Sequence, residues 1–86
     1  MNINQLILII KKKLKNNIVL EDLKIEDKTF LHTSHQTYQE GKFHIKLTIA
    51  SVELKNINKI KSTKKIYSIL EKELKEHIHS IQVLIN

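Results

Sequence analysis

Apolar residues near the start of the chain recur at three- and four-residue spacing, which is the repeat of an amphipathic helix. The stripe consists of Ile3, Leu6, Ile7, Ile10 and Leu14. Asn2 or Asn4 can cap the first turn, and lysines gather in the last turns, where the helix dipole favours cations. These are Lys11, Lys12, Lys13 and Lys15. The pattern predicts a helix over residues 3–15 that ends in a solvated lysine cluster.

Two later segments alternate apolar and polar residues, which is the period of a half-buried strand. The first covers residues 20–28, and the second is the clearest in the chain. In it, Phe43, Ile45, Leu47 and Ile49 alternate with His44, Lys46 and Thr48. The polar stretch between them, residues 29–41, predicts a loop that is longer than a plain hairpin needs. Long loops in compact domains often carry function.

The last third of the chain predicts another helix and a third strand. Ile57 and Ile60 indicate a short helical turn, and Ser62 is the expected N-cap of a longer helix that runs to about Glu76. Its buried face would consist of Ile66, Ile69, Leu70 and Leu74. Residues 79–85 then alternate as a strand.

The predicted order is therefore helix, strand, strand, helix, strand. The first two strands can pair as a hairpin, and a right-handed crossover through the helix would make the last two parallel. We predict a single α+β domain over residues 1–86, with a three-stranded mixed sheet and its helices on one face, since this arrangement buries all the apolar stripes together.

Composition narrows the chemistry. The chain has 86 residues, five histidines and no cysteine. It therefore has no disulfide and no thiolate of its own, and any soft metal that it binds must receive thiolates from another molecule. The formal net charge is +6, and every basic residue is a lysine. The abundance of Ile, Lys and Asn is typical of an AT-rich genome, although a nucleic-acid or membrane surface is the alternative explanation.

Signals for export and for enzymatic activity are both missing from the pattern. The apolar run of residues 6–10 is too short for a secretory core, and no stretch approaches the roughly 20 apolar residues of a membrane span. We expect a cytoplasmic protein. There is no Gly-rich phosphate loop and no HExxH helix. Ser34, His35 and Glu40 could form a hydroxyl–His–carboxylate group only within one loop, which lacks a rigid support. We therefore expect that the chain is not an enzyme.

The histidines are the best candidates for chemistry. His32 and His35 lie in the long loop, whereas His77 and His79 lie where the last helix meets the last strand. Neutral imidazole is a good ligand for zinc, copper and iron. The residues alone leave two interpretations open, a metal site formed by His32, His35 and His79 or a solvated polar loop. His44 is expected to be a surface residue on the outward face of its strand.

Four segments resemble motifs of the BolA family. Residues 44–51, HIKLTIAS, resemble its "HF-x-V-x-I-V-S" strand, and residues 27–32, DKTFLH, resemble its "D-x-S-x-x-H" entry to the first loop. Residues 64–74, KKIYSILEKEL, are similar to "R-x-V-Y-x-x-L-x-x-E-L", and residues 78–81, IHSI, fall on "I-H-A-L". The resemblance runs from about residue 3 to residue 85, with matching element order.

This resemblance implies a fold like a type II KH domain, with a short helical turn before the second long helix. It also implies a partner, a monothiol CGFS-type glutaredoxin, with which BolA-like proteins form heterodimers and share a glutathione-ligated [2Fe–2S] cluster. The family's histidine ligand falls on His79. The second ligand falls on His32, with His35 as the alternative. The isolated chain would then hold no cluster and is expected to be a monomer.

A nucleic-acid role is the alternative function, because some BolA-like proteins are thought to act as transcription regulators. Lys59, Lys61, Lys64 and Lys65 cluster around the start of the second long helix and could contact DNA phosphates. However, the usual "R-H-R" of the family is Ser62-Thr63-Lys64 here, and no GxxG clamp of the KH type is present. We also expect no aromatic platform beside the lysines.

Overall fold

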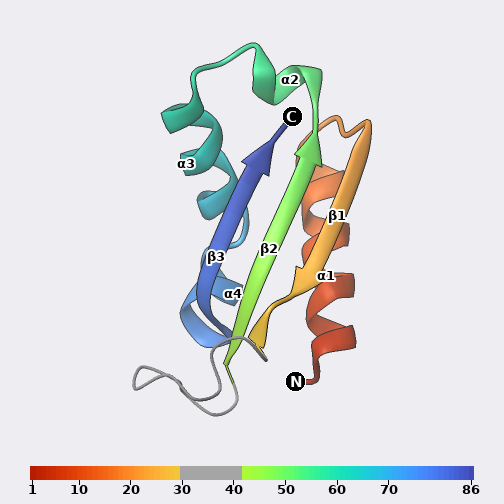
Figure 1. The fold of residues 1–86 in the computed structure, drawn as a ribbon, viewed down its shortest axis with the longest axis vertical. Coiled ribbons are helices and arrows are strands. Elements are labelled where there is room, and N and C mark those ends of the chain that lie inside the picture. Colours follow the sequence, from red (N-terminus) through yellow and green to blue (C-terminus); the bar gives the residue numbers. More distant parts are fainter. Residues whose placement is uncertain (30–41) are drawn as a thin grey trace.

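Three strands form one mixed sheet, and the helices pack against one of its faces (Figure 1). The computed structural model describes residues 1–29 and 42–86. In chain order, the elements are α1 (Ile3–Asn17), β1 (Asp22–Asp27), β2 (Phe43–Ala50), α2 (Val52–Lys55), α3 (Lys59–Ile69), α4 (Glu71–Glu76) and β3 (Ile78–Ile85). The strand β2 lies in the centre, antiparallel to β1 and parallel to β3. The predicted fold class and strand directions are confirmed.

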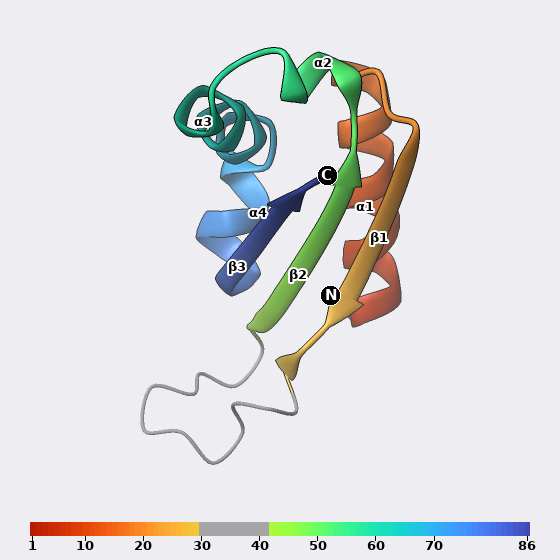
Figure 2. The same cartoon turned by 45° about the horizontal axis from the view of Figure 1, so that its top comes forward.

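The core lies between the inner face of the sheet and the helices. Its buried apolar side chains include three from α1 (Leu6, Ile10, Leu14) and three from β2 (Ile45, Leu47, Ile49). Three more come from the later helices: Leu54 from α2, Ile66 from α3 and Leu70 from the junction of α3 and α4. Burial of one such side chain stabilises the fold by about 1.5–3 kcal/mol. The opposite face of the sheet is mainly polar, and Figure 2 shows all the helices on the same side, which leaves this face without a covering helix.

The first helix begins at a capping box. The backbone N–H of Gln5 donates to Asn2 Oδ1 at 2.9 Å, and the backbone N–H of Asn2 donates to Gln5 Oε1 at 3.0 Å. These two bonds satisfy N–H groups that a helix start otherwise leaves without partners. Of the two caps that the sequence allowed, Asn2 is therefore the one used.

The sequence pattern predicted that all the lysines at the end of the first helix are solvated. Lys13 differs from this prediction. Lys13 Nζ lies 2.7 Å from a carboxylate oxygen of Glu73 in α4, and the Glu73 side chain is only 5% exposed. A carboxylate that is buried to this extent needs a cation beside it. The pair thus links the first and the last helix, whereas the neighbouring Lys11, Lys12 and Lys15 are exposed.

The connection between β2 and β3 differs from the prediction in two ways. The short helix comes earlier than expected, at α2, where the Ser51 hydroxyl accepts a bond from the N–H of Leu54. The N-cap of α3 is Asn58 and not Ser62, because Asn58 Oδ1 accepts from the N–H of Lys61 at 2.8 Å. Ser62 is buried inside α3 and donates to the carbonyl oxygen of Leu54. The long helix predicted to reach Glu76 is divided at Leu70 into α3 and α4.

Within the described residues, every helix is too short or too polar to cross a lipid bilayer.

Candidate metal-ligand site at the end of the sheet

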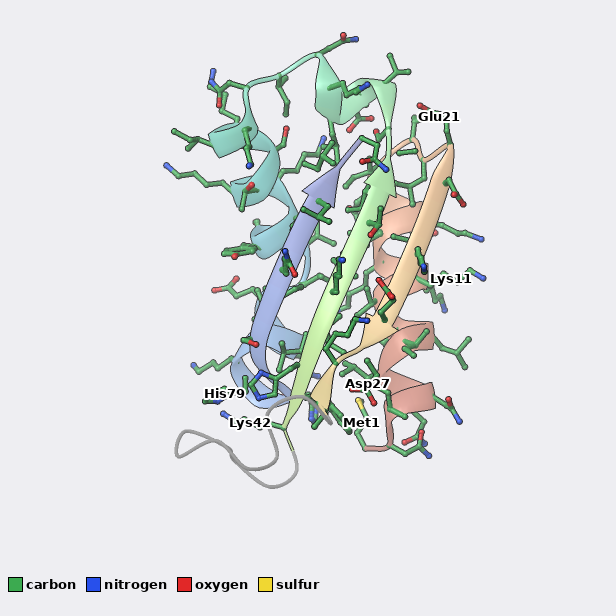
Figure 3. The ribbon with its side chains drawn as sticks, in the orientation of Figure 1. Met1, Lys11, Glu21, Asp27, Lys42 and His79 are labelled. Atoms are coloured by element: carbon green, nitrogen blue, oxygen red, sulfur yellow. The ribbon has the colours of Figure 1, made fainter. Side chains whose placement is uncertain are left out.

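The candidate ligand His79 lies near the start of β3, at one end of the sheet. Figure 3 shows its side chain at the end of the molecule where Lys42 and Asp27 are also found. The described chain stops at Thr29, just after β1, and resumes at Lys42, just before β2. The two described residues that border the segment 30–41, in which His32 and His35 occur, therefore lie at the end of the sheet where His79 is found.

A β-bulge determines the direction of the His79 side chain. Phe43 pairs with Ile78, but the next residue, His44, pairs with Ser80, so that His79 is an extra residue in β3. A bulge redirects side chains that a regular strand would alternate. Ile78 is 3% exposed and belongs to the core, whereas Ser80 is exposed. The extra residue lets Ile78 and Ile81 both contribute to the core although they are three positions apart.

The side chain of His44 contacts both His79 and Ser80. Its Nδ1 atom lies 2.6 Å from the hydroxyl oxygen of Ser80, and its ring centroid lies 4.9 Å from that of His79, with the two rings tilted by 56°. His79 and Ser80 thus both reach the outer face of the sheet, where the side chain of His44 lies. Packing between the rings limits the orientations that the imidazole of His79 can adopt.

The prediction that His44 is a surface residue is wrong. Its side chain does point to the outer face of the sheet, but the residue is only 4% exposed. Alternation along a strand shows which face a side chain occupies, and it does not show what lies over that face. The missed indication in the sequence concerns the bulge, because Ile78 and Ile81 cannot both face the core from a regular strand. The bulge in turn brings His79 and Ser80 against His44.

The chain just before the undescribed residues is hydrogen-bonded to His44 as well. The N–H of Lys28 donates to the carbonyl oxygen of His44 at 2.7 Å, and the N–H of His44 donates to the Thr29 hydroxyl at 3.1 Å. The same hydroxyl donates to a carboxylate oxygen of Asp27. The last described residue before the loop is therefore in direct contact with the residue that packs against His79.

The described residues do not form a complete metal site. No group of three or more His, Asp or Glu side chains within residues 1–29 and 42–86 is arranged to hold a metal ion. His77 is partly exposed and has its Nε2 atom 3.6 Å from the Glu76 carboxylate. His32 and His35 lie outside the described residues. Of the three predicted ligands, the structure thus places His79 alone.

Comparison with known proteins now identifies the family. The family model described as "BolA-like protein" matches residues 14–85. The chain belongs to the BolA family.

Two relatives by sequence and two by structure support the assignment. The chain is 33% identical over 73 residues to the "DNA-binding transcriptional regulator BolA" of Haemophilus influenzae, a match that covers 85% of this chain and 68% of the relative. It is 26% identical over 80 residues to "SufE-like protein 1, chloroplastic/mitochondrial" of Arabidopsis thaliana, covering 87% of this chain but only 22% of that protein.

The solved structures show the same fold. The BolA domain of SufE1 from Arabidopsis thaliana superimposes with a TM-score of 0.78 at 23% identity, covering 100% of this chain and 93% of that domain. BolA1 from the same plant gives a TM-score of 0.74 at 22% identity, covering 90% of this chain and 85% of that chain. The BolA fold that the motifs implied is therefore confirmed, and the likeness to a type II KH domain stays a prediction.

The second candidate surface of this BolA-family chain is the outer side of α3. Lys59, Lys61 and Lys64 are exposed there, and none of them forms an ion pair with another described residue. Lys65 differs, because its Nζ lies 2.7 Å from the Glu53 carboxylate. The hydrogen bond from Lys65, followed by one from the N–H of Val19, lowers the pKa of Glu53 below its ordinary value.

An aromatic side chain accompanies these lysines, contrary to what the sequence suggested. Tyr67 is 43% exposed and lines a shallow hollow together with Lys59, Ile60, Thr63 and Lys64. Lys64 and Tyr67 are three residues apart on one helix, so that they share a face. This helical spacing is visible in the sequence and was the signal available for finding Tyr67.

Proposed function

We propose that this BolA-family chain is a non-enzymatic adaptor that binds a monothiol CGFS-type glutaredoxin and ligates a [2Fe–2S] cluster shared with it and with glutathione. The observation that carries the proposal is the placement of His79. A bulge turns its imidazole to the outer face at one end of the sheet, and the described residues around it do not complete a metal site. The remaining ligands must then come from the loop and from the partner.

The donor set of the chain fits such a cluster. Iron–sulfur clusters are ligated by thiolates or, in Rieske centres, by two histidines in place of two cysteines. The chain has no cysteine, so it can supply only the imidazole share of the ligands. The bound cluster would supply one-electron redox chemistry, with a potential raised by the neutral imidazoles. The contribution of the chain is to present His79 in a fixed orientation, which the ring of His44 helps to maintain.

We propose His32 as the second ligand and His35 as the alternative. His32 follows Thr29 by three residues, and an extended chain spans at most about 3.3–3.6 Å per residue. This short separation in sequence from Thr29, which contacts His44, favours His32 as the second ligand. His35 is further away along the chain, six residues from Thr29 and seven from Lys42.

The proposal is tested by mixing the chain with a CGFS-type glutaredoxin, glutathione and a [2Fe–2S] cluster. We expect a stable heterodimer on gel filtration and a change in the visible absorption and circular dichroism of the cluster relative to the glutaredoxin alone. The change reflects replacement of sulfur ligands by nitrogen. Absence of a heterodimer, or a heterodimer whose cluster spectrum equals that of the glutaredoxin alone, would contradict the proposal.

DNA binding through α3 is the second candidate function. The 33% identical relative from Haemophilus influenzae is named a DNA-binding transcriptional regulator. Lys59 and Lys64 line the hollow beside Tyr67, and Lys61 is exposed on the same helix. None of these three lysines forms an ion pair with another described residue. Lys65 contributes less, because Glu53 neutralises it. Phosphate contacts by lysine dominate the affinity of such surfaces and make it fall steeply with salt.

We expect the triple change of Lys59, Lys61 and Lys64 to alanine to lower the affinity for duplex DNA more than a charge-matched control. The control replaces Lys11, Lys12 and Lys15 on α1, which removes the same charge from another exposed surface. Loss of three phosphate contacts also reduces the slope of log K against log salt by about 2.7. Equal losses in both variants would show that only net charge matters and would remove α3 as a DNA site.

A further inference from the structure

The two edges of the sheet differ in how they are protected. Natural proteins place charged residues on edge strands, because an uncharged edge with free backbone groups invites pairing with another strand. The edge strand β1 carries Asp22, Lys24, Glu26 and Asp27 among its six residues. The other edge strand, β3, has eight residues and contains no lysine, aspartate or glutamate. Its sequence from Ile81 to Ile85 is rich in strand-forming apolar residues.

The backbone of β3 offers a row of hydrogen-bonding groups on its open side. The N–H of Asn86 donates to the carbonyl oxygen of Ile49 in β2 at 2.8 Å. In a parallel ladder, alternate residues direct their backbone groups to the same neighbour, so Leu84 and Gln82 also face β2. Ile81, Val83 and Ile85 consequently direct their N–H and C=O groups away from β2, where no strand within the described part of the chain pairs with them.

Charged residues near the two ends of β3 favour a second copy of the same strand as its partner. Glu76, at the end of α4, is separated from β3 by one residue and has a side chain that is 50% exposed. At the other end, Lys55 and Lys59 are exposed and line a groove beside Leu84 and Asn86. In an antiparallel pair of two β3 strands, Glu76 of each copy comes near Lys55 and Lys59 of the other.

We propose that two copies of this chain associate edge to edge through antiparallel pairing of their β3 strands, with Gln82 near the two-fold axis. The full overlap of residues 78–86 with themselves centres on position 82. Such an interface is isologous, so that the contacts of one copy with its partner occur twice. The uncharged strand causes no repulsion at its centre, and the Glu76 and lysine ends are complementary. The proposed dimer differs from the monomer predicted from the sequence, and it requires neither glutaredoxin nor DNA.

Analytical ultracentrifugation of the purified chain tests the proposal. We expect a monomer–dimer equilibrium that shifts with protein concentration. Gln82→Lys should weaken the dimer about fivefold or more, since two like charges a few ångströms apart repel by about 1 kcal/mol in water. Gln82→Glu should weaken it similarly. An equimolar mixture of the two variants should restore dimerisation as a heterodimer, which native mass spectrometry distinguishes by mass.

Two control variants distinguish an effect of charge at the β3 edge from general effects of added charge or of a changed side chain. Gln82→Thr keeps a neutral strand former at the same position and should dimerise like the original chain. Thr48→Lys adds the same charge as Gln82→Lys on the outer face of β2, away from the β3 edge, and should also dimerise. A chain that stays monomeric at every concentration, or variants that fail to restore dimerisation when mixed, would overturn the proposal and leave the edge to a strand of another protein.

Discussion

Replacing His79 by alanine is expected to abolish the spectral change of the cluster in the complex with a CGFS-type glutaredoxin. The imidazole is the only one of the three predicted ligands whose position is described, and the bulge at His79 directs it to the end of the sheet where the loop begins. Loss of a partner that only supports a ligand already costs about 10–100-fold in metal affinity. We therefore expect cluster transfer to this chain to weaken by more than about 100-fold, as measured by titration under visible circular dichroism.

The matched control is His77→Ala. His77 is two residues away, is also partly exposed and faces Glu76 through its Nε2 atom. Its backbone carbonyl accepts a bond from the N–H of Phe43, and alanine leaves that bond intact. His77→Ala should therefore keep the spectral change of the original chain. If both variants behave alike, the ligand assignment is wrong, whether the change persists in both or is lost from both.

Replacing Leu47 by alanine is expected to lower the free energy of unfolding by about 2–5 kcal/mol. Leu47 lies in the central strand, is fully buried and belongs to the core cluster between the sheet and the helices. A domain of 86 residues has a total stability of about 4–13 kcal/mol. The variant should consequently be close to unfolded at elevated temperature. Urea unfolding should show a lower midpoint with little change in slope.

The control for this change is Thr48→Ala, one position further along the same strand. Thr48 points to the polar outer face and is partly exposed, so that its replacement removes few core contacts. We expect an effect within about 0.5 kcal/mol. A Leu47→Ala midpoint as high as that of Thr48→Ala would contradict the assignment of the inner face of β2.

The element order and the strand directions could be predicted because each rests on a period that the sequence contains. The stripe of Leu6, Ile10 and Leu14 has the helical repeat, and β2 alternates Ile45, Leu47 and Ile49 with polar residues. Both sets are fully or almost fully buried in the structure. A helix between two strands of one sheet carries the chain back to the end where the first strand began, which predicted the parallel pairing of β2 and β3. The preferred hand of such a crossover then decides on which face the helix lies.

The details of the site could not be predicted from such periods, because they depend on contacts between distant segments. His44 and Ser80 are 36 residues apart, and Lys13 and Glu73 are 60 apart. No local pattern shows that these side chains meet. The choice of Asn58 over Ser62 as the cap of α3 is similar, since the contact of Ser62 with Leu54 of α2 requires the tertiary fold.

The central claim is that a histidine nitrogen of this chain ligates iron in the shared cluster. The most direct test is pulsed EPR of the reduced cluster, with the chain labelled by ¹⁵N-histidine and the glutaredoxin unlabelled. We expect strong ¹⁵N hyperfine coupling that is diminished in His79→Ala and retained in His77→Ala. A reduced cluster in the heterodimer without ¹⁵N coupling from this chain would contradict the account.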